Sequence, residues 1–317
     1  MRFAMHTFCS IESGMQEVCI AEAIEEAFIE LKRIENIFSR YISTSQLSKI
    51  NQYAAGIPVE VELEVFQLIA RALEISKLTS GAFDISLAPA IDFWRSLEAN
   101  DALPTEKQIQ ELKTKIGYQN IILDSSRQTV YFVHSGTQLD LGAYVKGYAL
   151  GRMSLILKDR GVKEAQINLG GNIYLLNNQP QKIAIRNPLM PDEIVATASL
   201  MNSSISTSAN YERFFTIQGR RFGHLFNPKT ASPAESDILS VSVISQDAGL
   251  ADALSTAIFV LGFKQAKELL KGLTGVEAVI ICKAGLGKGV EVYHVTPKET
   301  LFFRPRCNGV YNINGNN

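Results

Sequence analysis

The hydrophobic residues of this chain repeat with two different periods, and the order of these periods restricts the fold. Spacings of three to four residues predict amphipathic helices at 20–38, 62–78, 105–117, 144–160 and from about 247 onward. Strand-like runs predict an opening strand at 3–12, single strands within 164–201, and hairpins at 120–133, 212–226 and 277–293. Helices and strands do not alternate regularly. The sequence therefore predicts an α+β fold, with mixed sheets and hairpins packed against helices.

The chain is long enough to bury a sizeable core. It has 317 residues, 46% of them hydrophobic and 20% charged, which is compatible with one large domain or with two lobes. We expect a single domain over residues 1–317 and a flexible Asn-rich tail from about residue 305. The net charge is −1 and no long basic run is present, which argues against a nucleic-acid partner.

No stretch in the sequence reaches the ~18 continuous apolar residues that span a bilayer. The N-terminus also lacks an apolar segment of the kind found in a secretion signal. As the sequence stands we expect a cytoplasmic protein; a periplasmic lipoprotein whose leader has been removed is the alternative. The spacing of the cysteines predicts four independent thiols, at Cys9, Cys19, Cys282 and Cys307.

Two glycine patterns bear on nucleotide binding. The segment GLGKG at 285–289 lies between two strand-like runs, so it predicts a hairpin turn and not a phosphate-binding loop at the start of a helix. No GxGxxG stands between a strand and a helix. Any dinucleotide is therefore bound without the Rossmann fingerprint.

Four other stretches contain candidate functional residues. Asp84, in SGAFDISLAPAIDFW, is either a loop cap or part of a ligand site, and the glycine pair of INLGGNIYLL predicts a bulge or a close approach of backbone or ligand. His224, in FGHLFNPKT, is by itself most simply a structural residue. Asp252 and Thr256 lie four residues apart, on one face of a helix, and offer the oxygen ligands that Mg²⁺ prefers. For Asp247, at the predicted start of the same helix, a role as helix cap is an equally good explanation as a role in metal binding.

Taken together and in order, eight blocks of the chain resemble the FAD:protein FMN transferases of the ApbE family. The blocks span residues ~5–262, and such an ordered match is far more specific than any single motif. The blocks are MHTFCSIE, IENIFSRYISTSQLSKIN, SGAFDISLAPAIDFW, LDLGAYVKGYA, INLGGNIY, ISTSANYERFF, GHLFNPKT and LADALSTAIFVLG. The resemblance implies a two-lobed arrangement with FAD in the cleft and Mg²⁺ near its pyrophosphate. It also implies transfer of FMN to a Thr or Ser hydroxyl of an acceptor flavoprotein, with release of AMP.

The resemblance also implies roles for individual residues. The metal ligands would be the backbone carbonyl of Val145 and the side chains of Asp252 and Thr256. Lys146 would neutralise phosphate charge, and Asp140 would hold its turn through backbone amides. The implied catalytic residues are Lys146, His224 and Asn227. The implied FAD-binding residues are Met5, Tyr41, Ala82, Phe83, Asp84, Gly142, Lys146, Gly147, Gly170, Gly171 and His224.

Three residues depart from the family pattern. His6 stands where the family usually has Gly, and Asn227 and Ala231 stand where it usually has Asp and the Gly of a Thr-Gly pair. Two alternatives to the transferase stay open. One is an FAD pyrophosphatase, in which water replaces the acceptor hydroxyl in the same bound geometry and the products are FMN and AMP. The other, suggested by the loss of a carboxylate at Asn227, is an FAD-binding protein with weak catalysis. We expect the acceptor to be a redox-complex subunit or a reductase with a Thr/Ser flavinylation motif.

Overall fold

The computed structural model describes residues 1–14, 18–210, 214–285, 289–303 and 311–313. The chain divides into two compact units, each built from segments that are distant in sequence. Unit 1 comprises Met1–Lys32, Lys146–Tyr211 and Ser236–Asn317, and unit 2 comprises Arg33–Val145 and Glu212–Glu235. Both contain helices and strands, which confirms the α+β class. That residues 1–317 form one domain with a nucleotide cleft stays a prediction.

Unit 1 is organised around a nine-stranded sheet in which all neighbouring strands are antiparallel. The order is β1-β2-β6-β7-β10-β15-β16-β17-β18. Its strands are β1 Arg2–Ala4, β2 Thr7–Glu12, β6 Ala165–Leu169, β7 Asn172–Leu176, β10 Ser203–Ala209, β15 Ile238–Ser245, β16 Val276–Lys283, β17 Val290–Val295 and β18 Thr300–Phe303.

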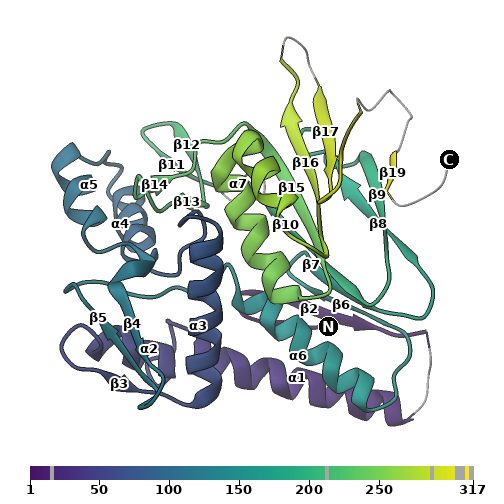
Figure 1. The fold of residues 1–317 in the computed structure, drawn as a ribbon, viewed down its shortest axis with the longest axis horizontal. Helices are drawn as coiled ribbons and strands as arrows, with labels where there is room; N and C mark the ends of the chain where they lie inside the picture. The colour runs from purple at the N-terminus through teal and green to yellow at the C-terminus, as the bar shows by residue number, and fades with distance from the viewer. Residues whose placement is uncertain (15–17, 211–213, 286–288, 304–310, 314–317) are drawn as a thin grey trace. The chain divides into compact units, whose positions relative to one another are not determined.

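Helix α7 (Ala248–Lys271) covers one face of this sheet, across β10, β15 and β16 (Figure 1). Alternate residues of β10 point to this face, and they are the buried serines Ser204, Ser206 and Ser208. Small side chains let the helix approach the sheet closely. The helix bends at Gly262, whose φ of 73° and ψ of 167° are not helical.

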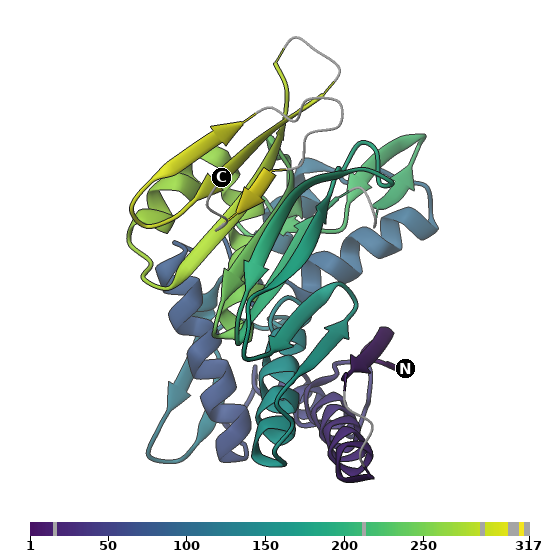
Figure 2. The ribbon, with the colours of Figure 1, turned by 90° about the vertical axis from the view of Figure 1, so that its right-hand side faces the viewer.

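The opposite face of the sheet is covered by three strands in the order β19-β9-β8. They are β8 Gln181–Arg186, β9 Ile194–Leu200 and β19 Tyr311–Ile313. Ile185 and Val195 from this small sheet share a hydrophobic core with Ile205, Val279 and other residues of the large sheet. Figure 2 shows the green strands of the small sheet beside the yellow strands β16 and β17.

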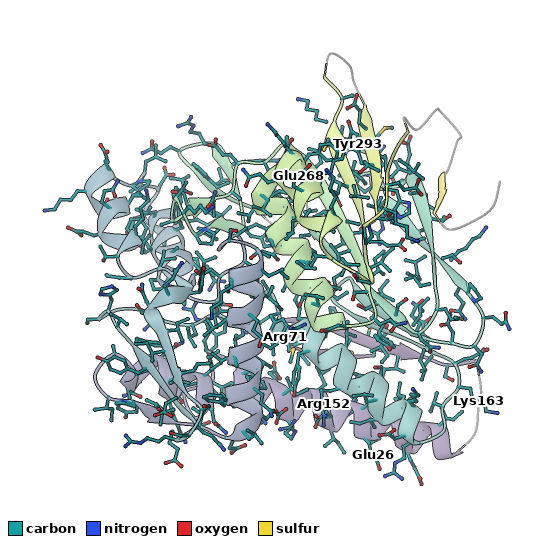
Figure 3. The ribbon with its side chains drawn as sticks, viewed as in Figure 1. Glu26, Arg71, Arg152, Lys163, Glu268 and Tyr293 are labelled. Atoms are coloured by element: carbon teal, nitrogen blue, oxygen red, sulfur yellow. The ribbon has the colours of Figure 1, made fainter. Side chains whose placement is uncertain are left out.

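Two helices complete unit 1. These are the first part of α1 (Val18–Phe38) and nearly all of α6 (Val145–Asp159). Ion pairs join them along their length, because Arg152 Nε lies 3.1 Å from Glu30 Oε1 and Arg160 pairs with Glu26. Figure 3 labels Arg152 and Glu26 where the two helices run side by side.

Unit 2 contains helices, short sheets and an aromatic core. Its remaining elements are α2 Gln46–Tyr53, α3 Leu63–Leu78, α4 Ala88–Ala99, α5 Glu106–Lys113, the 3₁₀ helix η1 Tyr118–Asn120, β3 Val59–Glu60, β4 Ile121–Asp124, β5 Thr129–Phe132, β11 Phe214–Ile217, β12 Arg220–Gly223, β13 Phe226–Asn227 and β14 Ser232–Pro233. Trp94 packs against Phe215, Phe222 and Phe226. This cluster anchors α4 to the chain around β11–β14.

All five predicted helices and the three predicted hairpins are present among the described residues. Thr105 forms the capping box of α5 with Gln108. The prediction of a single opening strand was wrong, because residues 2–12 form a hairpin of β1 and β2 that turns at Met5 and His6. The elements that were not predicted include helices α2 and α4 and strand β10.

Some predictions fall outside the described residues. They include 286–288, within GLGKG, and residues 304–310 and 314–317 of the tail. Within that tail, Tyr311–Ile313 forms strand β19, and the flexibility of the tail stays a prediction. Cys9 and Cys282 are free thiols as predicted, while Cys307 and the side chain of Cys19 are not described. Within the described residues, no helix has the length and apolar character needed to cross a membrane.

Candidate active site

Asp252 is the central candidate residue of unit 1. Its side chain extends from α7 and is only 4% exposed, so it is not a solvated residue of a surface helix. Its Oδ2 accepts a hydrogen bond from the Gly147 amide at 3.0 Å, and its Oδ1 accepts one from Asn172 Nδ2 at 2.8 Å. A carboxylate oxygen has two acceptor positions, so each oxygen keeps one available. The carboxylate is thus held by the protein and still able to bind a cation.

Gly147 marks the closest contact between α6 and α7. A Cβ at this position would lie 2.1 Å from the Ala248 carbonyl oxygen and 2.7 Å from Asp252 Cβ. No side chain fits there without moving backbone. The glycine predicted to let backbone approach the nucleotide is therefore required for packing between helices, and its contact with FAD stays a prediction.

Thr256 lies one helical turn after Asp252 on α7, with 8% of the residue exposed. Its Oγ1 lies 3.4 Å from Ser208 Oγ, which also lies 2.8 Å from Ser255 Oγ. Ser255 in turn donates a hydrogen bond to the Asp252 carbonyl at 2.8 Å. The two predicted side-chain ligands therefore lie on one face of α7, in a connected polar network.

The donor set of α7 fits Mg²⁺ in kind. Mg²⁺ is commonly bound by one or two carboxylates while its other ligands are waters and substrate phosphates. Asp252 supplies one carboxylate and Thr256 a neutral oxygen. Among the described residues, no group of three or more His, Cys, Asp or Glu side chains is placed to hold a metal ion. A site in which Asp252 and Thr256 are completed by phosphate oxygens is compatible with this finding.

Val145 and Lys146 begin α6, immediately before Gly147. The Lys146 side chain is half-buried and makes no hydrogen bond or ion pair with any residue that the structure describes. A cation without a protein partner is suited to a phosphate. Val145 is buried and belongs to unit 2, and its role as a carbonyl ligand stays a prediction.

Two tight turns lie side by side at one end of the sheet in unit 1. Gly170 and Gly171, with φ of 61° and 92°, join β6 to β7, while Met5 and His6, with φ of 49° and 59°, join β1 to β2. Two consecutive left-handed residues are the signature of a type I′ hairpin turn. A Cβ on Gly170 would lie 2.6 Å from Thr7 Oγ1, so this glycine is needed where the two hairpins meet.

In unit 2, the segment Ala82–Asp84 is buried and its polar groups are occupied. Asp84 Oδ1 accepts hydrogen bonds from the amide and hydroxyl of Ser86, and Oδ2 accepts one from the Tyr118 amide at 2.7 Å. Burial raises the pKa of Asp84, although these hydrogen bonds act in the opposite direction. The Phe83 ring packs against Tyr144. Asp84 therefore organises the loop as a cap, one of the two alternatives left open by the sequence.

Asp140 holds its turn as predicted, because its Oδ1 accepts a hydrogen bond from the Gly142 amide at 2.7 Å. Its other oxygen lies 3.1 Å from Arg40 Nη1, and Arg40 also pairs with Asp92. Burial alone would lower the pKa of Arg40, but the two carboxylates raise it overall. Arg40 also stacks on Tyr41, whose hydroxyl accepts a hydrogen bond from Arg95. Tyr41 is 52% exposed, which leaves ring surface for a ligand.

His224 and Asn227 lie on either side of Leu225 and Phe226. His224 is half-buried in the bend between β12 and β13. Asn227 Oδ1 accepts a hydrogen bond from the Lys229 amide at 2.9 Å, and its backbone carbonyl accepts one from Ala231 at 2.9 Å. Asn227 thus closes the turn 227–231, in which Ala231 has a φ of 54°. Phe226 and Ala231, at the two ends of this stretch, belong to the aromatic core of unit 2.

Three residues around the predicted site were missed. Asn172 and Ser208 contact Asp252 and Thr256, and Arg40 contacts Asp140. The available signals were the asparagine directly after the glycine pair and the alternating serines of SSISTSA. Asparagine and serine are polar, so hydrophobic periodicity does not identify them as buried residues. The predicted site residues are divided between unit 1 and unit 2.

Comparison with known proteins identifies the family. The ApbE family model matches residues 5–280. FAD:protein FMN transferases from Treponema pallidum and Klebsiella pneumoniae are each 31% identical to this chain, over 82% and 83% of it and 76% and 83% of their own lengths. The crystal structure of the ApbE protein from Thermotoga maritima is 31% identical with a TM-score of 0.78, covering 89% of this chain and 93% of that one. The chain therefore belongs to the ApbE family of flavin transferases.

Proposed function

We propose that this enzyme transfers FMN from FAD to a Thr or Ser hydroxyl of an acceptor flavoprotein, releases AMP and requires Mg²⁺. The observation that carries the proposal is the buried carboxylate of Asp252, one helical turn from Thr256, in a chain whose relatives are named FAD:protein FMN transferases. A buried carboxylate with an open acceptor position on each oxygen is costly unless it is paired. A cation at the pyrophosphate would supply that pairing.

The bond changes involve few protein groups. The acceptor hydroxyl oxygen forms a bond to the FMN phosphorus, the bond from that phosphorus to the bridging oxygen breaks, and AMP leaves with that oxygen. The hydroxyl proton passes to a base or to solvent. Phosphoryl transfer depends mainly on positioning and on charge stabilisation. We assign phosphate neutralisation to Lys146 and orientation of the hydroxyl to His224 and Asn227.

Asp252, Thr256 and the Val145 carbonyl would hold Mg²⁺. When bound, it would stabilise the negative charge that develops on the phosphate oxygens. We assign the contacts with FAD to the exposed ring of Tyr41 and the two type I′ turns. We also assign them to Gly142, Gly147 and the loop at 82–84, as the resemblance implies. The acceptor would be a redox-complex subunit or a reductase.

Incubation with FAD, Mg²⁺ and a candidate acceptor peptide, followed by intact mass and AMP analysis, tests the proposal. We expect the acceptor to gain the mass of FMN with one AMP released per transfer. Free FMN and AMP without modification would identify a pyrophosphatase. Unchanged FAD that is nevertheless bound would identify a binding protein with weak catalysis.

Asp252→Asn tests the role of the carboxylate with little change in size. We expect this variant to lose Mg²⁺-dependent AMP release while keeping most of its FAD affinity. The reason is that the cation would mainly stabilise the negative charge that develops on the phosphate in the transition state. Asp247→Asn is a matched control at the N-cap of the same helix, since Asn caps a helix as well as Asp does. AMP release at the wild-type rate from the Asp252 variant would contradict the metal assignment.

A further inference from the structure

The two proposed side-chain ligands of unit 1 are each held by a residue that would not itself touch the metal. Asn172 is 2% exposed at the start of β7, directly after the Gly170–Gly171 turn, and Ser208 is 8% exposed near the end of β10. Their side chains contact Asp252 and Thr256 respectively. We propose that Asn172 and Ser208 are positioning residues that orient the two proposed ligands toward the cation, an inference that rests on the function proposed above.

The orientation of the Asn172 amide follows from its partner. A carboxylate only accepts hydrogen bonds, so the amide nitrogen of Asn172 must face Asp252 Oδ1 at 2.8 Å. The Gly147 amide faces Oδ2 at 3.0 Å. Two donors from different elements, β7 and α6, therefore fix the plane of the carboxylate. Without Asn172, Asp252 would be held from one side only and would be free to rotate about its terminal bond.

The protons of the serine network can be assigned in the same way. Ser255 donates its proton to the Asp252 carbonyl at 2.8 Å, so its oxygen can only accept from Ser208 at 2.8 Å. Ser208 has then used its one proton and can only accept from Thr256 at 3.4 Å. The Thr256 proton is thus directed at Ser208. Both lone pairs of Thr256 Oγ1 remain available for a cation.

The chain supplies a matched control for each position. Ser206 lies two residues before Ser208, on the same face of β10, and is fully buried, but its hydroxyl has no hydrogen-bond partner among the described residues. Asn177 is 1% exposed and just follows β7, and its amide donates to the carbonyls of Gln179 and Leu200 instead of to Asp252. Replacing either control removes a buried polar group without touching the proposed ligands.

The experiment measures the Mn²⁺ dissociation constant by EPR at saturating FAD, together with the Mg²⁺ concentration that gives half-maximal AMP release. Loss of a residue that orients a metal ligand typically weakens metal affinity 10–100-fold. We expect a rise of at least about tenfold in both quantities for Asn172→Ala, and of roughly threefold for Ser208→Ala because its bond to Thr256 is long. Asn177→Ala and Ser206→Ala should leave both unchanged.

The outcomes separate this inference from the proposed function. If the wild-type protein binds Mn²⁺ but Asn172→Ala and Ser208→Ala bind it equally well, the positioning role is wrong and the metal site stands. If the wild-type protein binds no Mn²⁺ at saturating FAD, both are wrong. If Asn177→Ala and Ser206→Ala weaken Mn²⁺ binding equally, then the loss of any buried polar group has this effect, and the inference is overturned. Ser208→Ala removes a single oxygen, so it decides the matter even if Asn172→Ala does not fold.

Discussion

Replacing Gly147 by alanine tests whether the glycine serves the protein or the nucleotide. In the structure its added Cβ would lie 2.1 Å from the Ala248 carbonyl oxygen, more than an ångström short of ordinary contact. The obstacle is backbone on one side and Asp252 Cβ on the other, so no side-chain rotation relieves it. Helices α6 and α7 must separate. The Gly147 amide, 3.0 Å from Asp252 Oδ2, then moves out of hydrogen-bonding range.

The expected cost has two parts. Forcing an extra carbon into a packed contact costs about 1–3 kcal/mol. Losing a hydrogen bond to a charged group costs about 1.5–3 kcal/mol. The higher helix propensity of alanine compared with glycine stabilises the fold by up to about 1 kcal/mol. We therefore expect Gly147→Ala to lower the free energy of unfolding by about 1.5–6 kcal/mol, estimated from these contributions.

Gly151→Ala is the matched control, because it lies one turn later in α6 and its added Cβ would meet no atom within 4 Å. We expect this control to raise the free energy of unfolding by up to about 1 kcal/mol through helix propensity. The assay is equilibrium unfolding in urea, carried out without FAD. If Gly147→Ala leaves the free energy of unfolding of the FAD-free protein unchanged and weakens only FAD binding, then the glycine serves the nucleotide and the packing argument is wrong.

Three further predictions follow from particular residues. Asn227→Asp should raise transferase turnover several-fold if the missing carboxylate limits catalysis, and the turn should survive because Asp can also accept from the Lys229 amide; equal turnover would show that the chain compensates elsewhere. His6→Gly should raise the free energy of unfolding by about 0.5–1 kcal/mol by relieving a left-handed side chain, and a thermal-unfolding midpoint at or below that of wild type would contradict this. Burial raises the pKa of the Cys9 thiol to about 11 from 9.0. Because the unfolded thiol ionises first, stability should fall as the pH rises from about 9 to 11, and in Cys9→Ala this loss should be smaller.

The sequence predicted the elements in which period and end signals agree. Helix α5 is an example, because Thr105 and Gln108 announce its start before any packing is known. Strand β10 was missed for the opposite reason: its buried face consists of serines, whose polarity hides a strand in the centre of the sheet. Helix α4 was missed because its apolar segment was considered only for Asp84, as a loop cap or part of a ligand site. For both elements, tertiary contacts determine a secondary structure that the local sequence pattern does not show.

The candidate site was predictable to the extent that it depends on helical spacing. Asp252 and Thr256 share a face because residues four apart on a helix do so. The residues that hold them come from β7 and β10, and such contacts depend on strand order, which no local pattern specifies. The hairpin at Met5 and His6 was missed because neither residue is typical of a type I′ turn.

The departures from the family pattern differ in their physical consequences. His6 and Ala231 both have left-handed backbone, with φ of 59° and 54°, which explains why glycine is usual at these positions. For Ala231 the strain of about 1–2 kcal/mol is offset in part by the buried methyl, which contributes about 0.8 kcal/mol. Its carbonyl accepts a hydrogen bond from Trp94. His6 is exposed and has no such burial. Both departures therefore concern backbone energy. Asn227 has ordinary backbone and changes only a charge, so it is the departure through which catalysis would be altered.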